Sequence, residues 1–204
     1  MSRTPLLLAT SNPGKVREMR KVLRGLPLAV VGLADALPGL AFRERGATFA
    51  DNARAKSLFY SRRWDGLTLA EDSGLEVDAL AGAPGVRSAR FSSPKPTAEK
   101  NNRKVLRLLR TVPLSGRGAR FVCVMVLARN GRVLKEVRGH VRGRIGVEGR
   151  GRNGFGYDPL FYYPRLRRTF AELGPTEKNA VSHRGRALRR LVCFLAARTK
   201  AGSR

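Results

Sequence analysis

The residues most suited to chemistry lie in an acidic island within a strongly basic chain. The chain has 41 Lys+Arg and 15 Asp+Glu, yet four acids fall within eight positions: Glu71, Asp72, Glu76 and Asp78. Glu71 and Asp72 follow the apolar run Leu67–Ala70 and precede Ser73-Gly74. This order predicts a buried strand that ends at Ala70 and presents two carboxylates in a loop, at the strand end where open α/β sheets bind ligands. Such carboxylates can hold a hard cation such as Mg²⁺ or accept a proton from water. A structural cap of the following turn is the alternative.

The N-terminal segment is a candidate anion site. The apolar run Pro5–Thr10 predicts a buried strand, Ser11–Gly14 a turn, and Lys15–Leu23 a helix with apolar residues at helical spacing. A helix N-terminus presents unpaired N–H groups, and Lys15 adds a positive charge there. The spacing is not that of a Walker A loop. An ordinary capped helix start is the alternative interpretation.

Two later clusters have residue types that could contact a ligand. In Asn153–Asp158, glycines flank an aromatic residue, so Phe155 could stack on a base. In Glu177–Arg184, the hydrogen-bond donors are Lys178, His183 and Arg184. The alternatives are a turn packed on the core and a solvated helix start, respectively.

The remaining patterns predict an α/β domain with a mixed sheet. Thr48 and Asp51 resemble a capping box that opens a helix to about Arg63. Asn130-Gly131 between apolar runs is a strong hairpin signal. The other expected elements are a strand over Ala29–Leu33, a helix capped by Thr97, hairpin arms over Ala119–Arg129 and Arg132–Val147, and a last helix to about Ala197.

The composition limits the classes of partner. A net charge of +26 attracts polyanions such as nucleotides, nucleic acid or a membrane surface. The basic residues are spread along the chain, which favours a solvated basic surface over a dedicated nucleic-acid groove. Cys123 and Cys193 are expected to be buried, as in a reducing compartment. The apolar run Pro5–Ala9 is too short for a signal peptide, and no stretch is long enough for a membrane span, so we expect a cytoplasmic protein with no membrane partner.

Taken in order, these clusters closely resemble the Ham1/inosine triphosphate pyrophosphatase family. The resemblance covers nearly the full length of the chain, and five segments in register are highly specific. The matching segments are TSNPGK (10–15) with Glu18, TFADNARAKS (48–57), AEDSGLEVDALAGAPGVRSARF (70–91), GFGYDPLF (154–161) and EKNAVSHRGRAL (177–188).

The resemblance implies a function. The family hydrolyses ITP, dITP and XTP to the monophosphate and pyrophosphate with Mg²⁺, which removes unusual purines from the nucleotide pool. It also implies a mixed, elongated and curved sheet with flanking helices that form two lobes around a central cleft. Residues 1–198 would form this single domain, residues 199–204 a flexible tail, and two chains a homodimer.

The resemblance also implies a role for each matching residue. Asp72 would bind the metal and act as general base, with Glu71 and Lys15 as further catalytic residues and Ser73 as a substrate contact. Lys56 would contact phosphate. The phosphate loop would be Thr10, Ser11, Asn12, Pro13, Gly14 and Lys15, the base-stacking loop Phe155, Gly156, Tyr157 and Asp158, and the purine-reading group Lys178, His183 and Arg184.

The chain departs from the family pattern in two places. The usual Asp-Asp pair is Glu71-Asp72 here, so Glu71 is either a metal ligand or a supporting residue. Upstream, Glu44 is the candidate second metal ligand, although a shift of one residue would place Arg43 there.

Two other functions stay open at this stage. The charge alone would suit a basic nucleic-acid-binding protein, but carboxylates repel phosphate unless a cation intervenes, so that function leaves the acidic island unexplained. The other is a related pyrophosphatase acting on other modified nucleotides.

Overall fold

The structure is a computed structural model that describes residues 3–201. The β-strands are β1 (Thr4–Leu8), β2 (Leu28–Gly32), β3 (Leu67–Val77), β4 (Gly118–Arg129), β5 (Arg132–Ile145), β6 (Phe161–Tyr163) and β7 (Arg168–Thr169). The α-helices are α1 (Pro13–Leu23), α2 (Leu33–Ala36), α3 (Phe49–Ser61), α4 (Ala98–Leu108), α5 (Pro175–Val181) and α6 (His183–Ala201). Short 3₁₀ helices are η1 (Asp78–Leu80), η2 (Gly85–Arg90), η3 (Leu114–Gly116), η4 (Pro164–Leu166) and η5 (Phe170–Glu172).

The expected mixed α/β architecture is confirmed. The described strands form a seven-stranded sheet in the order β2-β1-β3-β4-β5-β6-β7. β1 pairs in parallel with β2 and β3, whereas β6 pairs antiparallel with β5 and β7. The hairpin turn is also confirmed: Asn130 and Gly131 have φ of +49° and +71°, as a type I′ turn requires.

The chain divides into two compact units. Unit 1 comprises Met1–Asp72, Cys123–Gly139 and Arg184–Arg204, and unit 2 comprises Ser73–Val122 and His140–His183. The proposed single domain over residues 1–198 stays a prediction. Of the tail 199–204, residues 202–204 lie outside the described residues.

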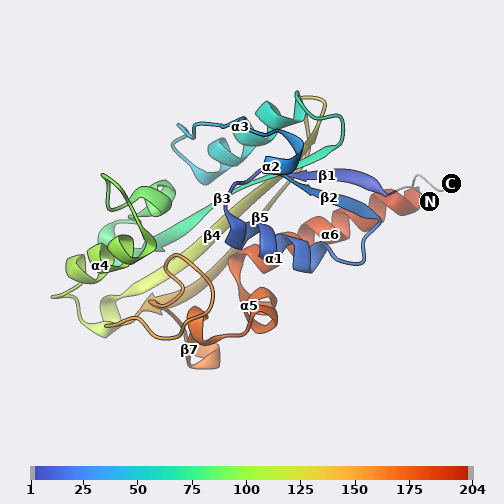
Figure 1. Cartoon of the computed structure of the whole chain (residues 1–204). Coiled ribbons are helices and arrows are strands. Elements are labelled where there is room, and N and C mark those ends of the chain that lie inside the picture. The colour runs from blue at the N-terminus through green and yellow to red at the C-terminus, as the bar shows by residue number, and fades with distance from the viewer. Residues whose placement is uncertain (1–2, 202–204) are drawn as a thin grey trace. The chain divides into compact units, whose positions relative to one another are not determined.

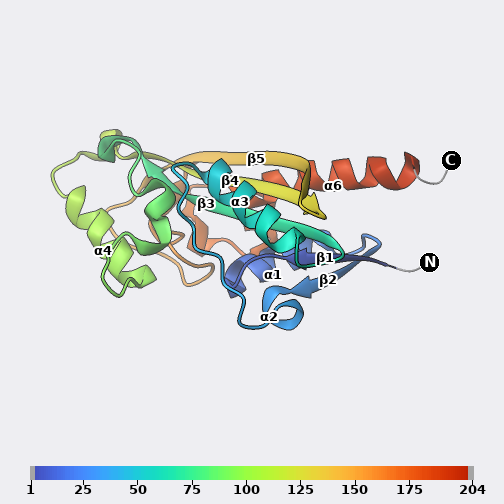
Figure 2. The same ribbon diagram turned by 90° about the horizontal axis from the view of Figure 1, so that it is seen from above.

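In unit 1, both faces of the sheet are buried. Leu6 and Leu8 of β1 pack with Met19 of α1 and Leu188 of α6. Leu7, with the opposite orientation, packs on the α3 side with Tyr60 and Ala70. Figures 1 and 2 show α3 on one face of these strands and α1 and α6 on the other. The two-residue period of a strand therefore sorts β1 and β3 side chains between two helical layers.

In unit 2, aromatic rings pack against one another within the core. The ring centroid of Phe121 lies 4.6 Å from that of Phe161 and 5.9 Å from that of Phe170. Leu75, Val105 and other apolar residues complete this cluster.

Two expectations are wrong. β3 does not end at Ala70 but continues to Val77, so Glu71, Asp72 and Ser73 lie within a strand rather than in a loop. Cys123 is buried as expected, but Cys193 is exposed on α6.

Among the described residues, no helix is long and apolar enough to span a membrane.

Candidate active site

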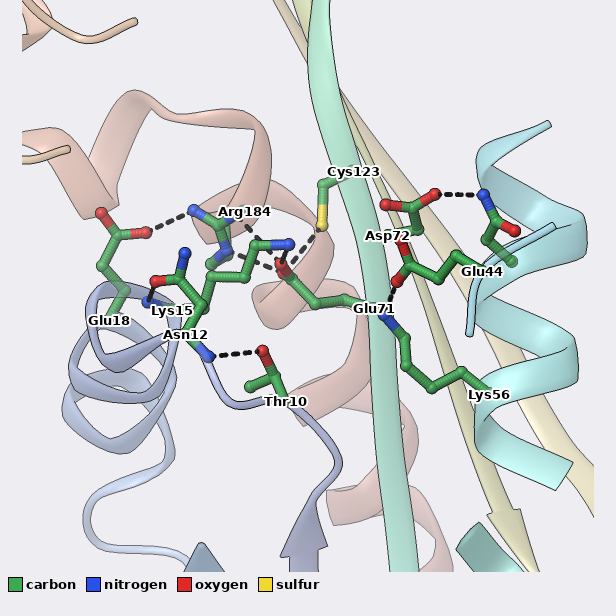
Figure 3. Close-up of polar contacts among 11 residues, drawn as sticks. Thr10, Asn12, Lys15, Glu18, Glu44, Lys56, Glu71, Asp72, Cys123 and Arg184 are labelled. Carbon is green, nitrogen blue, oxygen red and sulfur yellow. Dashed lines mark hydrogen bonds and ion pairs between the residues drawn. The ribbon is translucent and has the colours of Figure 1, made fainter. Parts of the chain in front are cut away.

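Glu71 and Asp72 occupy opposite faces of β3, because consecutive side chains of a strand alternate. Figure 3 shows Glu71 reaching toward α1 and α6, and Asp72 facing α3. The two carboxylates therefore form separate clusters, both within unit 1.

The Glu71 cluster is a buried ion-pair network. The Arg184 guanidinium donates to both carboxylate oxygens of Glu71, at 2.7 and 3.0 Å, and to Glu18 at 2.6 Å. The Lys15 ammonium lies 2.8 Å from Glu71, whose side chain is fully buried. Burial alone would raise the pKa of Glu71, but Arg184 and Lys15 outweigh it and hold that pKa well below its usual range. Glu71 is thus ionised and saturated with donors.

The Asp72 cluster has a different electrostatic balance. Asn52 Nδ2 donates to Asp72 Oδ2 at 2.9 Å, and Lys56 forms an ion pair with Glu44. Burial, with the nearby charge of Glu44, raises the pKa of Asp72 above its ordinary value. On this face of β3, the charge of Glu44 therefore lies close enough to disfavour the ionised form of Asp72.

The predicted phosphate loop is the start of α1. Asn12 caps the helix, with its side chain accepting from the Lys15 N–H at 3.1 Å, and Pro13 occupies the first turn. The Thr10 hydroxyl accepts from the Asn12 N–H at 3.2 Å. Ser11 is exposed and Gly14 is buried. The loop follows β1, whose extension hydrogen-bonds to β3 through Ala9 N–H and the Leu69 carbonyl at 2.9 Å.

In unit 2, the predicted base-stacking loop is held by a buried carboxylate. Asp158 accepts from the Phe155 N–H at 2.8 Å and forms an ion pair with Lys178. The Lys178 ammonium also lies 4.8 Å from the centroid of the Phe155 ring. The Gly156 carbonyl accepts from the Asn102 side chain at 3.1 Å. Asp158 thus holds the backbone of the half-buried Phe155, and Lys178 lies against its ring.

Three other predicted site residues lie in unit 2: Tyr157, His183 and Ser73. Tyr157 is buried and donates to the Ser88 carbonyl at 2.9 Å, and its phenol pKa is raised by burial. The His183 ring stacks on Phe121 with centroids 4.6 Å apart. Ser73 is half-buried on β3.

Carboxylates surround the guanidinium of Arg184, which is buried between Glu71 and Glu18. Its predicted place in the purine-reading group, with Lys178 and His183, stays a prediction.

Sequence reasoning missed Asn52, which orients Asp72. The signal was available, since Asn52 and Lys56 are four residues apart and so share one face of α3.

Glu44 lies beside Lys56, while Arg43 is exposed, so the structure favours Glu44 over Arg43 for this cluster. Within residues 3–201, no group of three or more His, Cys, Asp or Glu side chains is arranged to hold a metal.

Comparison with known proteins identifies the family. The family model described as the Ham1 family matches residues 6–194. The chain is 49% identical to a dITP/XTP pyrophosphatase of Desulforamulus reducens, over 93% of this chain and 94% of that protein. It is 47% identical to one of Gloeobacter violaceus, over 92% of each.

Solved structures agree. A HAM1 protein from Coxiella burnetii is similar with a TM-score of 0.86 and 40% identity, over 95% of this chain and 99% of that one. A nucleoside-triphosphatase (dITP/XTP pyrophosphatase) from Mycobacterium abscessus has a TM-score of 0.72 and 40% identity, over 94% and 99%. The chain therefore belongs to the Ham1 family.

Proposed function

We propose that the protein is a magnesium-dependent nucleoside triphosphate pyrophosphohydrolase that converts ITP, dITP and XTP to the monophosphate and pyrophosphate. The observation that carries this proposal is the Asp72 cluster, with Glu44, Lys56 and Asn52 on the α3 face of β3. It is supported by relatives of 47–49% identity that are named dITP/XTP pyrophosphatases.

The Asp72 cluster fits a magnesium ion. Mg²⁺ is commonly held by one or two carboxylates together with substrate phosphates, so a cluster of three protein ligands is not required. The raised pKa of Asp72, caused by its burial and by Glu44, is the electrostatic situation that a bound cation would relieve. Bound to Asp72 and Glu44, the ion would neutralise charge on the phosphate oxygens.

The residues of unit 1 would then act on the triphosphate. The N–H groups and dipole of the α1 start favour an anion at Thr10–Lys15. Lys15 and Lys56 would offset phosphate charge, with Glu71 and Glu44 fixing the positions of their ammonium groups. Asp72, oriented by Asn52, would accept a proton from or orient the water that attacks the α-phosphorus, and pyrophosphate would leave without a covalent intermediate.

In this proposal, Glu71 is a supporting residue rather than a ligand. It lies on the opposite face from Asp72 and is occupied by Arg184 and Lys15. Arg184 would hold Glu71 in position.

The residues of unit 2 would bind the purine. Phe155 would stack on the base, and Asp158 and Lys178 would hold the ring in place, with Ser73 and His183 as further contacts. A site that hydrogen-bonds a 6-oxo group leaves its own donors unpaired against the 6-amino group of adenine. That one nucleotide reaches both units, across a cleft between two lobes, is part of the proposal, as are the homodimer and the cytoplasmic location.

The test is pyrophosphate release from ITP, dITP, XTP, GTP and ATP, with Mg²⁺ and with EDTA. We expect release with Mg²⁺ only, and kcat/KM for ITP and XTP far above that for ATP. Comparable values for ATP and ITP, or full activity in EDTA, would contradict the proposal. A strong preference for a different modified nucleotide would assign the chain to a related pyrophosphatase.

A further inference from the structure

Unit 2 contains a cavity that the proposed reaction does not use. It has a volume of about 460 Å³ and lies over β5, β6, β7 and the loop after β5. Its lining includes apolar groups, an aromatic ring and arginines: Leu114, Val147, Tyr162, Arg144, Arg150 and Arg167. The volume lies within the range of sites for small ligands.

The strand register places the aromatic ring and a guanidinium side by side. Arg144 of β5 pairs with Tyr162 of β6, and Tyr162 pairs with Thr169 of β7. The Arg144 guanidinium carbon lies 5.7 Å from the centroid of the Tyr162 ring. Thr169 donates to the Arg150 carbonyl at 2.8 Å, which ties the loop that carries Arg150 to the sheet. The sheet thus presents the aromatic ring of Tyr162 with the charged guanidinium of Arg144 beside it.

The charge of the cavity favours an anion. Three arginines line it, and the carboxylate of its one acidic lining residue, Glu148, lies 2.9 Å from the guanidinium of Arg150. Arg144 and Arg167 are exposed. An anion with a flat apolar part would satisfy both the arginines and the ring, which is the chemistry of a nucleotide.

The basic surface continues along β5 beyond the cavity. His140, Arg142 and Arg144 are alternate residues of this strand, so they share one face, and all three are exposed. Alternate residues on a strand are about 6.7 Å apart. This repeat is comparable to the separation of successive phosphates in an extended single strand. The guanidinium of Arg142 lies 3.9 Å from the carboxylate of Asp78.

We propose that this cavity and the adjoining face of β5 bind single-stranded nucleic acid. One nucleotide would occupy the cavity with its base on Tyr162 and its phosphate between Arg144 and Arg167, and further phosphates would follow Arg142 and His140. Sequence-tolerant single-strand sites combine a basic track with aromatic stacking in this way. A second copy of the chain is disfavoured as occupant, because an isologous contact would set the same basic strip against itself. The inference does not depend on the pyrophosphatase activity.

The test is fluorescence anisotropy with labelled dT12 and U12 in EDTA, across 50–200 mM salt. We expect log K of the wild type to fall linearly with the logarithm of the salt concentration, with a slope of about −0.7 for each neutralised phosphate. Arg144→Ala/Arg167→Ala should make that slope shallower by about 0.7, because both arginines contact the same phosphate. Arg103→Ala/Arg107→Ala on α4 makes the same charge change at exposed positions in the same unit and should leave the slope unchanged.

The aromatic contact is tested separately. Tyr162→Ala should weaken binding about tenfold, whereas Tyr162→Phe, which keeps the ring, should bind like the wild type. All these variants should retain pyrophosphate release from ITP, so failure here is distinguishable from failure of the proposed function. Equal loss in the α4 control, equal affinity for a duplex, or competition by UMP as effective as by U12 would overturn the proposal.

Discussion

At the scale of single residues, the alternation of β3 separates two neighbouring acids. Glu71 has a depressed pKa because its donors outweigh its burial, whereas Asp72 has a raised pKa because burial and Glu44 dominate. The ionised carboxylate of Glu71 therefore stabilises the folded state, whereas burial and the charge of Glu44 disfavour the ionised carboxylate of Asp72. Substitution by the neutral amide should therefore act in opposite directions on stability.

For Asp72→Asn we expect turnover of ITP to fall by about 10²–10⁴-fold, the usual contribution of a general base, with little change in KM. Stability at neutral pH should be unchanged or raised, because the amide removes an ionised group whose protonated form burial favours. Glu76→Gln, four residues along the same strand, is the control and should behave like the wild type. Near-normal turnover of Asp72→Asn in Mg²⁺ would remove this residue from the mechanism.

For Glu71→Gln we expect a loss of about 3–5 kcal/mol at neutral pH, since it leaves Arg184 and Lys15 facing an uncharged group in the interior. The folded-state pKa is depressed, so the stabilisation is fully present above the unfolded-state pKa and is lost as pH falls through the folded-state value. Urea unfolding of wild type and variant should thus converge in acid. A pH-independent difference would show that the effect is one of packing rather than charge.

At the scale of elements, the sequence predicted strands, helices and caps where the signal was local. The Thr48 capping box and the Thr97 cap are confirmed, as is the hairpin around Asn130-Gly131. The end of β3 was predicted wrongly because Ser73-Gly74 reads as a turn. What keeps β3 extended comes from distant segments, such as Ser88, which donates to the Gly85 carbonyl and accepts from the Leu75 N–H.

The same limit applied to the site. The local pattern singled out Asp72 and Lys15 by their chemistry, and the family resemblance added Lys56. The partner of Glu71, however, is Arg184, which is 113 residues away, and no local pattern joins the two. The assignment of Arg184 to the purine-reading group comes from the family resemblance and stays a prediction, while its guanidinium contacts Glu18 of α1 and Glu71 of β3.

Gly74 tests why β3 continues. A Cβ at this position would lie 2.3 Å from Ser88 Oγ and 2.6 Å from the Gly85 carbonyl oxygen. Because the carbonyl belongs to the backbone of η2, the clash needs a backbone shift, and we expect Gly74→Ala to lower the free energy of unfolding by about 1–3 kcal/mol. Gly149→Ala is the control, since its nearest neighbour would be an ordinary 3.4 Å away. Equal melting temperatures for the two variants would show that η2 adjusts freely.

At the scale of the whole molecule, the two units carry different parts of the proposed chemistry. Unit 1 contains the carboxylates and lysines that would face phosphate, and unit 2 contains the Phe155 loop. The net charge of +26 acts on both, because it attracts any polyanion from solution and is screened by salt. Charge alone therefore distinguishes neither the substrate nor the unit that binds it.

A division of labour between the units predicts two kinetic signatures. Phe155→Ala should raise KM for ITP about tenfold with kcat retained, because loss of stacking removes binding that ground state and transition state share. Asp72→Asn should instead lower kcat with KM retained. Phe194→Ala on α6 is the matched control, because the Lys135 ammonium lies 5.4 Å from its ring centroid, as Lys178 lies over Phe155. Steady-state kinetics on ITP and XTP measure both parameters, and a fall in kcat for Phe155→Ala equal to that for Asp72→Asn would mean that the two units do not divide the work in this way.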